Sequence, residues 1–534
     1  MALLVSKPPP CIIHEDDHLL VVNKPAGINT HSPSPFAGEG IYEWLKNREM
    51  RWAELSIIHR LDKITSGLMV FSKTRQASRS LTDQFTNRAV QKEYYFLTAN
   101  RTSKKEFAVQ TSLVRTGDKY VAKETRPGPA EAVTKFEYVG SQMRFFLWRA
   151  RPLTGKTHQI RVHAQSAAIP ILGDELYGGD PFERVCLHAG QLKFDHPERN
   201  AAISFECEAE FFKDPPAEIR RLLIEPELTN GYRLIHGRAD SHENLYLERW
   251  GDYLLSQSDS ELGAEQKSRI ELIARNLKGK GAYHKRLNKQ VRKASQEEAA
   301  PGLVFGEEAP EIFAVRENGV NYEISFQQGY SVGLFLDQRE NRRRLLRNHI
   351  APGFAVFDGE PKEVLNTFAY TCGFSVCAAM AGARTTSLDL SKKYLEGGRR
   401  NFVLNALKPD EHDFIYGDVF DWAGRLAKKG RQFDLILLDP PTFSQAKRGE
   451  RFQAAKDYGK LVEIILPLLK RQGVLFASTN AQRFEPEEFL GTIQGSIVSA
   501  KRKTRQMRYV PQPFDFPISK EEPAYLKTVW IQVE

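Results

Sequence analysis

Three polar clusters in the first third of the chain hold the residues best suited to chemistry. They are NKPAG at 23–27, HRLDKITSG at 59–67 and TGKTHQIRVH at 154–163, each lying between apolar runs. An aspartate held in such a turn is costly unless its carboxylate has a partner, and Asp62 is in that position. Arg161, on a run that we expect to be a strand, is the candidate partner. We therefore predict a pocket in which Arg161 keeps Asp62 ionised.

Taken one at a time, these clusters also have a structural explanation. Asp62 with Thr65 and Ser66 could cap a turn, and His158 with Arg161 could be exposed polar positions of a strand. Taken together, they resemble the RluA-type pseudouridine synthase family. The resemblance covers residues 12–212 and continues in KEYYFLT (92–98), PILGDELYGG (170–179) and LHAGQLKFDHP (187–197).

This resemblance implies a role for three residues. Asp62 matches the catalytic aspartate, Arg161 the arginine that pairs with it, and Tyr94 the tyrosine that contacts the target base; Lys156 stands where the family usually has arginine. A uridine must lose its N-glycosidic bond, rotate and be rejoined through carbon 5. Asp62 could act as nucleophile at the ribose or assist formation of a glycal, and the sequence leaves both routes open. Neither route requires a metal or another cofactor.

A second set of acidic residues follows predicted strands in the last third of the chain. VLNTFAYTCGFS (364–375) predicts a strand whose following turn opens a helix at Gly373, and Asp389, Asp418 and Asp439 each close a later strand. Carboxyl ends of parallel strands form the ligand-binding edge of a doubly wound sheet. The motif G-x-G-x-x-G is absent, which disfavours a nicotinamide cofactor. The rigid Pro440 after Asp439 would aim backbone carbonyls at a planar base, so we expect S-adenosylmethionine beside a nucleobase.

From about Gly329 to Glu534 the sequence is similar to the RlmK/RlmI group of large-subunit rRNA methyltransferases. The matching blocks are GLFLDQRENRRRL (333–345), LNTFAYTCGFS, LDLSKKYLEGGRRN, LDPPTFSQAKR and FASTNAQRF. The resemblance implies catalytic roles for Asp439 and Pro440 and a segment, 336–341, that closes over the cofactor. It implies that S-adenosylmethionine is bound by Phe335, Asp337, Arg339, Phe368, Thr371, Gly373, Asp389, Asp418 and Asp439.

The methylated atom can be argued from the cysteines. Methylation of cytosine at carbon 5 needs a cysteine nucleophile, and neither DPPTFS nor ASTNAQRF contains one. Cys372 and Cys377 lie in the cofactor strand and helix, where small cysteines usually pack. We therefore favour guanine N7 of large-subunit rRNA, which resembles the branch with an Asn-containing STNAQRF-like segment. The alternatives are a cytosine-5 methyltransferase and a ribosome-assembly factor with one inactive head.

The organisation of the chain predicts several domains, because 534 residues exceed the size of one hydrophobic core. Residues 1–220 form an α+β, β-rich pseudouridine synthase domain in this prediction. Residues 221–330 form a linker and a small α+β domain. Residues 331–534 form an α/β, doubly wound, Rossmann-like class I methyltransferase domain, since strands there alternate with helices.

Charge and composition point to a polyanionic partner. The net charge is +9, and basic stretches occur at 278–293 and 501–508; Arg342, Arg343 and Arg344 are further candidates for RNA contact. We expect 23S rRNA or its precursor as partner, with tRNA as the alternative for the synthase, and no DNA. No apolar run approaches a membrane helix, and the five scattered cysteines indicate neither disulfides nor a zinc site. These features predict a cytoplasmic protein without a metal.

Overall fold

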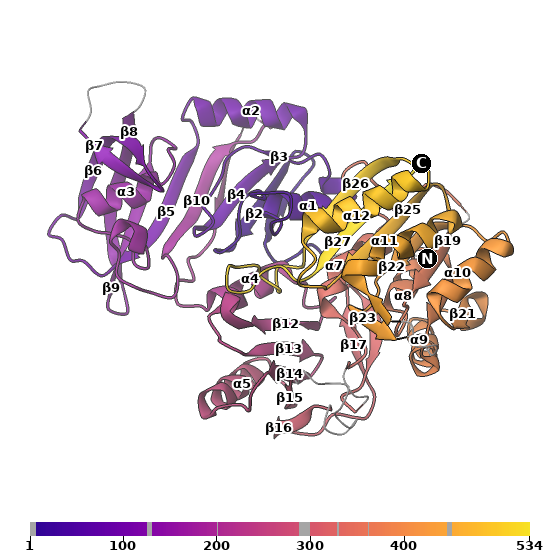
Figure 1. Ribbon diagram of the computed structural model, residues 1–534. Coiled ribbons are helices and arrows are strands. Elements are labelled where there is room, and N and C mark those ends of the chain that lie inside the picture. The colour runs from indigo at the N-terminus through magenta and orange to yellow at the C-terminus, as the bar shows by residue number, and fades with distance from the viewer. Residues whose placement is uncertain are drawn as a thin grey trace.

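A computed structural model describes residues 7–124, 131–199, 201–287, 300–327, 331–360, 362–445 and 451–534. Along the chain it contains a large mixed sheet, a five-stranded sheet with an adjoining hairpin, and a seven-stranded sheet (Figure 1). We call these the first, middle and third units. No helix among the described residues is long and apolar enough to cross a membrane.

The first unit is built on one long sheet with the strand order β1-β2-β4-β10-β5-β9-β8-β6-β7. Its strands β2 and β4 are buried along their whole length, in agreement with their mostly apolar sequences. The strands are β1 Ile12–Glu15, β2 Leu19–Lys24, β3 Ser56–Ile57, β4 Ser66–Ser72, β5 Gln91–Thr98, β6 Glu106–Thr116, β7 Lys119–Lys123, β8 Glu131–Gln142, β9 Phe145–Pro152, β10 Leu187–Asp195 and β11 Ala202–Glu206; the helices are α1 Ile41–Arg48, α2 Arg75–Thr86, α3 Gln159–Ser166 and α4 Pro215–Leu223.

The HQIRVH run corrects our expectation of a strand, because it forms helix α3. His158 precedes the helix with a positive φ of 56°, and the Gln159 side chain accepts hydrogen bonds from the Thr154 hydroxyl and the Lys156 backbone. Ile160 and Ala164, one helical turn apart, then pack into the same apolar cluster. Tertiary packing therefore makes this segment helical, although its alternating polar and apolar residues favour a strand.

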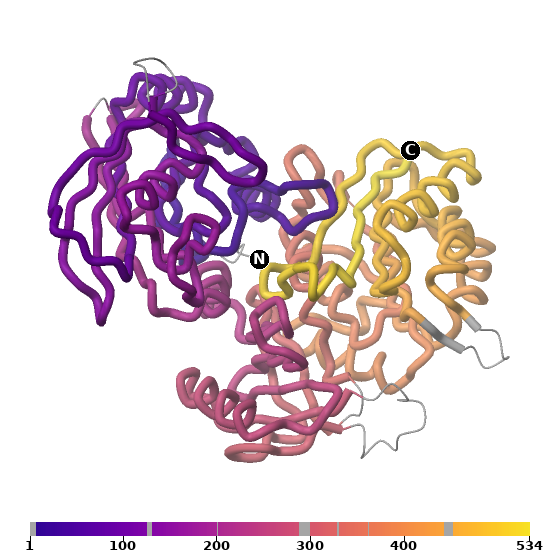
Figure 2. Tube along the Cα trace, turned by 60° about the vertical axis from the view of Figure 1, so that its left-hand side comes forward, coloured from indigo at the N-terminus to yellow at the C-terminus, as the bar shows by residue number. Residues whose placement is uncertain are grey.

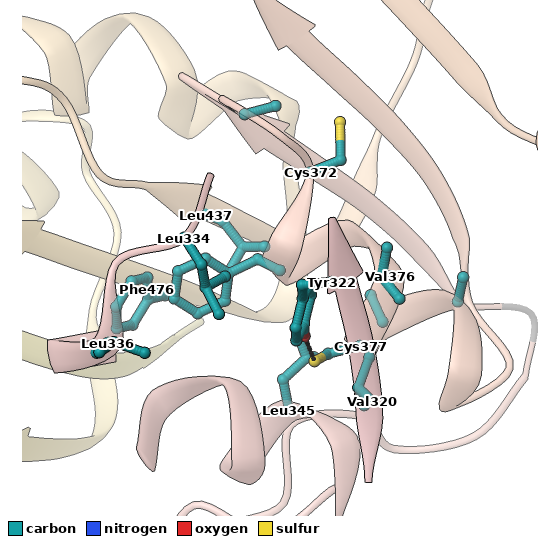
Figure 3. Packing of buried hydrophobic residues seen from close by; sticks show 14 of the residues in the cluster. Val320, Tyr322, Leu334, Leu336, Leu345, Cys372, Val376, Cys377, Leu437 and Phe476 are labelled. Atoms are coloured by element: carbon teal, nitrogen blue, oxygen red, sulfur yellow. Dashed lines mark hydrogen bonds between the residues drawn. The ribbon is translucent and has the colours of Figure 1, made fainter. Parts of the chain in front are cut away.

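The middle unit shares its core with the third unit. One face of its sheet packs on α5 around Ile235, Leu247 and Ile270, whereas Trp250 and Tyr283 join the main core of the third unit. Figure 3 shows Val320 and Tyr322 of the hairpin packed within that core. The elements are β12 Gly231–His236, β13 Tyr246–Trp250, β14 Tyr253–Ser258, α5 Ala264–Asn276, β15 Gly281–Arg286, β16 Gly302–Gly306, β17 Phe313–Glu317 and β18 Val320–Ile324.

The third unit is a sheet of order β21-β20-β19-β22-β25-β27-β26 with helices on both faces. Leu435 and Leu437 of β22 face α8 and α9, and Ile436 and Leu438 face the α10–α12 side. The elements are α7 Arg339–Leu346, β19 Glu363–Thr367, α8 Gly373–Met380, β20 Arg384–Asp389, α9 Lys392–Leu404, β21 Asp413–Tyr416, α10 Val419–Lys428, β22 Phe433–Leu438, β23 Phe443–Gln445, β24 Arg451–Gln453, α11 Ala454–Ile465, β25 Leu469–Thr479, α12 Pro486–Ser499, β26 Thr504–Val510 and β27 Lys527–Val533.

Strands β21, β20, β19 and β22 are neighbours and parallel, as the sequence pattern predicts. Their carboxyl ends therefore lie at one edge of the sheet. In Figure 2 the yellow carboxy-terminal segment approaches the indigo part of the first unit. Two aromatic contacts, Phe36 with Tyr509 and Trp44 with Phe514, join the two units there.

Two candidate active sites

The first unit contains a cavity of about 730 Å³ that brings Asp62, Tyr94 and Arg161 together. Asp62 lies on the turn between β3 and β4, Tyr94 on β5 and Arg161 on α3. His158 also lines the cavity, as do the exposed cations Arg60, Lys63, Arg88 and Lys156 at its rim. The three residues predicted from separate parts of the sequence thus share one pocket.

The NKPAG segment supports the turn that carries Asp62. The Lys24 ammonium donates to the backbone carbonyls of Pro25 and Ile28 at 3.0 and 2.8 Å and approaches that of Lys63 at 3.4 Å. Burial lowers the pKa of Lys24 to about 7. Thr30 adds a second brace, since its hydroxyl donates to the Leu61 carbonyl and accepts from the Leu61 N–H.

Arg161 lies close to Asp62 but directs its best hydrogen bonds elsewhere. Its Nη1 is 3.8 Å from Asp62 Oδ2, whereas Nε and Nη2 donate to the two oxygens of Asp174 at 2.7 Å each. The guanidinium also stacks over the Tyr177 ring, with its centre 4.7 Å from the centroid. Asp174 and Tyr177 both come from PILGDELYGG, a segment whose positioning role the sequence alone does not indicate.

Two further polar side chains near Asp62, His158 and Tyr94, are neutral. His158 Nε2 lies 3.9 Å from Asp62 Oδ2, its Nδ1 lies 2.8 Å from the Tyr177 hydroxyl, and burial lowers the pKa of this imidazole. Burial, reinforced by the charge of Asp62, raises the pKa of Tyr94 well above its usual range. Tyr94 therefore contributes an un-ionised phenol to the cavity.

The second candidate site lies at the carboxyl edge of the third sheet. Asp389 accepts hydrogen bonds from the backbone N–H groups of Tyr370 and Ser391, each at 2.8 Å, and burial raises its pKa. The loop after β19 turns sharply, because Phe368, Tyr370 and Cys372 all have positive φ. This conformation is uncommon for residues other than glycine and marks a strained turn above the sheet edge.

The segment before α7 reaches the same edge. Gln338 donates from Nε2 to Asp439 Oδ2 at 3.1 Å and to the Ser478 hydroxyl at 2.8 Å. Burial raises the pKa of Asp439 to about 6. Asp337 accepts a hydrogen bond from the Tyr525 hydroxyl at 3.0 Å, and burial raises its pKa as well.

The other predicted residues lie around these carboxylates in different ways. Phe335 is 50% exposed, and its ring lies 5.2 Å from that of Tyr370. The Thr371 hydroxyl donates to the Gly333 carbonyl, and Gly373 begins α8. Asp418 caps α10 by accepting from the Phe420 N–H at 2.8 Å. Arg339 instead forms a buried bidentate pair with Asp515, so its guanidinium is directed to the carboxy-terminal segment.

The prediction that the arginines of α7 contact RNA is wrong. Arg342, Arg343 and Arg344 are no more than 3% exposed; Arg342 pairs with Glu317, Arg343 with Glu49 and Arg344 with Glu39. Of the basic stretch 278–293, residues 288–293 lie outside the described residues. In the stretch 501–508, the Arg502 guanidinium donates to the main-chain oxygens of five residues and has a structural role.

The DPPTF and STNAQRF segments meet, since the Thr442 hydroxyl donates to the Asn480 side chain. Cys372 and Cys377, in the loop after β19 and in α8, are buried, and burial raises the pKa of each thiol to about 12. In Figure 3 the Cys377 sulfur lies against the Tyr322 hydroxyl, at 3.1 Å. Among the described residues, no group of three or more His, Cys, Asp or Glu side chains is arranged to hold a metal ion.

Comparison with known proteins matches two parts of the chain to two families. Residues 267–520 match the model of the S-adenosylmethionine-dependent methyltransferase family. The Bacillus subtilis protein YwbD is 33% identical over 321 residues, which are 59% of this chain and 78% of that protein. A ribosomal RNA large subunit methyltransferase of Deinococcus radiodurans is 32% identical over 57% of this chain and 73% of its own length. The chain belongs to this methyltransferase family.

The solved structure of SMU.776 in complex with SAH superposes with a TM-score of 0.51 at 27% identity, covering 64% of this chain and 87% of that one. The methyltransferase family match begins within the middle unit, in agreement with the shared core. Residues 18–166 match the RNA pseudouridylate synthase model. The first unit is thus an RluA-type pseudouridine synthase domain, and the third is a Rossmann-like methyltransferase domain that uses S-adenosylmethionine.

Proposed function

We propose that one chain carries out two reactions: the synthase domain converts a uridine in RNA to pseudouridine, and the methyltransferase domain methylates an RNA base. The observation that carries this proposal is the convergence of Asp62, Tyr94 and Arg161 in one cavity, while Asp389 and Asp439 lie at one sheet edge. The proposed domain limits remain 1–220, 221–330 and 331–534.

In the synthase domain, the proposed reacting group is the Asp62 carboxylate. The Arg161 guanidinium places its positive charge 3.8 Å from this carboxylate, and Asp174 holds that guanidinium in place. Asp62 either attacks ribose carbon 1′ as the N-glycosidic bond breaks, or assists the same cleavage by removal of the carbon-2′ proton, which gives a glycal. The released uracil rotates and bonds to carbon 1′ through its carbon 5, which displaces Asp62 or returns the proton to carbon 2′. Carbon 5 then loses its own proton. The protonated Tyr94 ring packs against the base. The target must leave its helix to enter the cavity, at a cost of a few kcal/mol, and the cations at the rim offset part of this cost through phosphate contacts.

In the methyltransferase domain, the residues at the sheet edge fit S-adenosylmethionine. Asp389 suits a ribose diol, Asp418 an amine, and the half-exposed Phe335 the face of a base. The cofactor supplies an electrophilic methyl group. When ionised, Asp337 and Asp439 would supply negative charge to a sulfonium bound at this sheet edge, and Gln338 fixes the orientation of Asp439.

For the acceptor, we favour guanine N7 over cytosine carbon 5. The buried, protonated thiols of Cys372 and Cys377 are unsuited to attack on a pyrimidine ring. Guanine N7 carries its own lone pair, so its methylation requires alignment more than proton removal. Pro440 and the Thr442–Asn480 pair provide a rigid wall for that alignment.

The proposed substrate is 23S rRNA or its precursor, and tRNA is the alternative for the synthase reaction. The relatives named as ribosomal RNA large subunit methyltransferases support this choice, as does the net charge of +9.

The test is to map pseudouridine and methylated bases in ribosomal and transfer RNA from cells that lack the protein. The cells are complemented with the wild type, Asp62→Asn or Asp439→Ala. We expect one pseudouridine to be absent with Asp62→Asn alone and one methylated base to be absent with Asp439→Ala alone. If neither mark depends on the protein, it acts as a binding factor and the proposal fails.

A further inference from the structure

Helix α7 has a composition that a buried helix rarely has. Its sequence is RENRRRLL, and every residue from Arg339 to Leu345 is buried. A buried charge without a partner is strongly unfavourable, so each of these side chains needs an opposite charge or a hydrogen bond. The identity of those partners shows what the helix depends on.

Two of the four arginines find their carboxylates within the methyltransferase domain: Arg339 pairs with Asp515 and Arg342, across the domain core, with Glu317 of the β17–β18 hairpin. Both pairs are bidentate. These two contacts fix the face of α7 that is turned toward its own domain.

The remaining charges of α7 are matched by the synthase domain. Arg48, at the end of α1, donates from Nη1 to Glu340 Oε2 at 3.2 Å. Its Nη2 donates to both carboxylate oxygens of Glu225. Arg343 pairs with Glu49, and Arg344 lies 3.2 Å from Glu39. All these side chains are at most 15% exposed. Although burial alone would raise the pKa of Glu340, Arg48 and neighbouring arginines lower it to about 2.

Helix α7 directly continues the segment that reaches the methyltransferase site. Gln338, one residue before the helix, donates to Asp439 and Ser478, and its Oε1 accepts from Asn341 within the helix. The position of α7 therefore sets the position of the Phe335–Gln338 segment. A shift of the helix would move Gln338 away from Asp439.

We propose that Arg48, Glu49 and Glu39 of the synthase domain are positioning residues for the methyltransferase site, acting through α7 on the Phe335–Gln338 segment. None of the three lines the synthase cavity. The methyltransferase domain thus needs the synthase domain in the same chain as a structural partner, independently of the synthase reaction. This inference rests on the proposed cofactor site at the sheet edge.

The test uses the full chain and S-adenosylhomocysteine as the probe. Arg48→Met and Arg48→Lys are compared with Arg51→Met as the matched control, because Arg51 is 45% exposed and pairs with Glu15. Calorimetry gives the Kd for S-adenosylhomocysteine, and hydrogen exchange follows peptides covering 333–346. We expect Arg48→Met to raise the Kd at least about tenfold through lost preorganisation, with Arg48→Lys intermediate and Arg51→Met unchanged.

A second pair of variants covers the case in which Arg48→Met does not fold. Glu39→Gln and Glu49→Gln leave Arg48 in place and neutralise the carboxylates that face Arg344 and Arg343; Glu39 also faces Arg508 and accepts from Asn47. They should raise the KM for S-adenosylmethionine and speed exchange in 333–346, while pseudouridine formation changes less than about twofold, as expected for a remote site. Wild-type affinity and protection in all these variants would overturn the inference. Failure of the wild type to bind the probe would instead overturn the proposed cofactor site.

Discussion

The two sites differ in what their aspartates are bonded to. Within the described part of the chain, no hydrogen bond reaches the Asp62 carboxylate; its nearest partners are Arg161 and His158, at 3.8 and 3.9 Å. In the methyltransferase domain, by contrast, Asp389 and Asp439 each accept hydrogen bonds of 2.8–3.1 Å from neighbouring groups.

This difference matches the chemistry that we assign to the sites. A carboxylate that reacts must keep its lone pairs available and needs only a nearby positive charge to stay ionised. A carboxylate that holds a ligand gains from being fixed beforehand, since the ordering cost is then met during folding. The pattern of hydrogen bonds thus separates a proposed reacting group from proposed binding groups.

The largest effect is expected in the synthase domain, where Arg161 lies beside Asp62. Arg161→Met removes the charge beside Asp62, and we expect uridine isomerisation to fall at least about 10²-fold, as when other electrostatic catalytic groups are removed. It also leaves Asp174 buried without a partner, which costs about 3–5 kcal/mol of stability. The double variant Arg161→Met/Asp174→Leu should recover the stability but not the activity. Recovery of both would show that Arg161 is only structural. Pseudouridine formation and thermal unfolding measure the two effects.

The second prediction concerns the fixed carboxylates. Asp389→Asn replaces one acceptor oxygen with an NH₂ group, so the amide can no longer accept from both Tyr370 and Ser391. We expect the Kd for S-adenosylhomocysteine to rise about 10–100-fold, or about 1.4–2.8 kcal/mol. The control is Asp410→Asn, which changes an exposed aspartate of the same domain. An unchanged Kd in Asp389→Asn would remove Asp389 from the cofactor site.

The positions of some predicted residues relative to the strands follow from local sequence patterns. Asp62 and Asp389 could be placed because the first lies between two apolar strands and the second closes a parallel strand. The partners were harder to predict. Asp174 and Gln338 hold reacting or binding carboxylates through contacts between segments distant in sequence, which local patterns do not encode.

The arginines of α7 show the same limit in reverse. Three consecutive arginines, Arg342 to Arg344, look like an RNA-binding surface, because exposed positive charge is the usual reason for such a run. In the structure these arginines are buried, and Arg343 and Arg344 pair with Glu49 and Glu39, which lie about 300 positions earlier in the sequence. Sequence alone cannot pair charges across two domains.

A smaller effect should appear in the pH dependence of methylation. Burial raises the pKa of Asp439 to about 6, above the ordinary 3.8. If the ionised carboxylate acts, methylation is full above that pH and is lost as the pH falls through about 6. Ionisation of such a group disfavours folding, so the stability contributed by its protonated form is lost as pH rises from 3.8 through about 6.

Gln338→Leu tests the origin of this limb. The Gln338 N–H stabilises the ionised form of Asp439, so its removal should move the acid limb of methylation to higher pH. Rate–pH profiles of methyl incorporation into RNA from cells lacking the protein measure the shift, with pseudouridine formation as the internal control. A limb that stays in place would show that another group titrates.

The smallest expected effect decides between the two methyl acceptors. Cys372 and Cys377 are fully or almost fully buried in the core beside the cofactor loop, at 0% and 2% exposure. Replacing either with alanine removes one small buried group, which costs about 1–2 kcal/mol of stability. Because neither thiol attacks the base in our proposal, methyl incorporation should change less than about threefold in both variants when each is assayed well below its melting temperature.

A cytosine-5 mechanism requires a thiolate that bonds to carbon 6 of the ring, and its removal would abolish the reaction. Complete loss in one folded alanine variant would therefore contradict guanine N7 as the acceptor and assign that cysteine as the nucleophile.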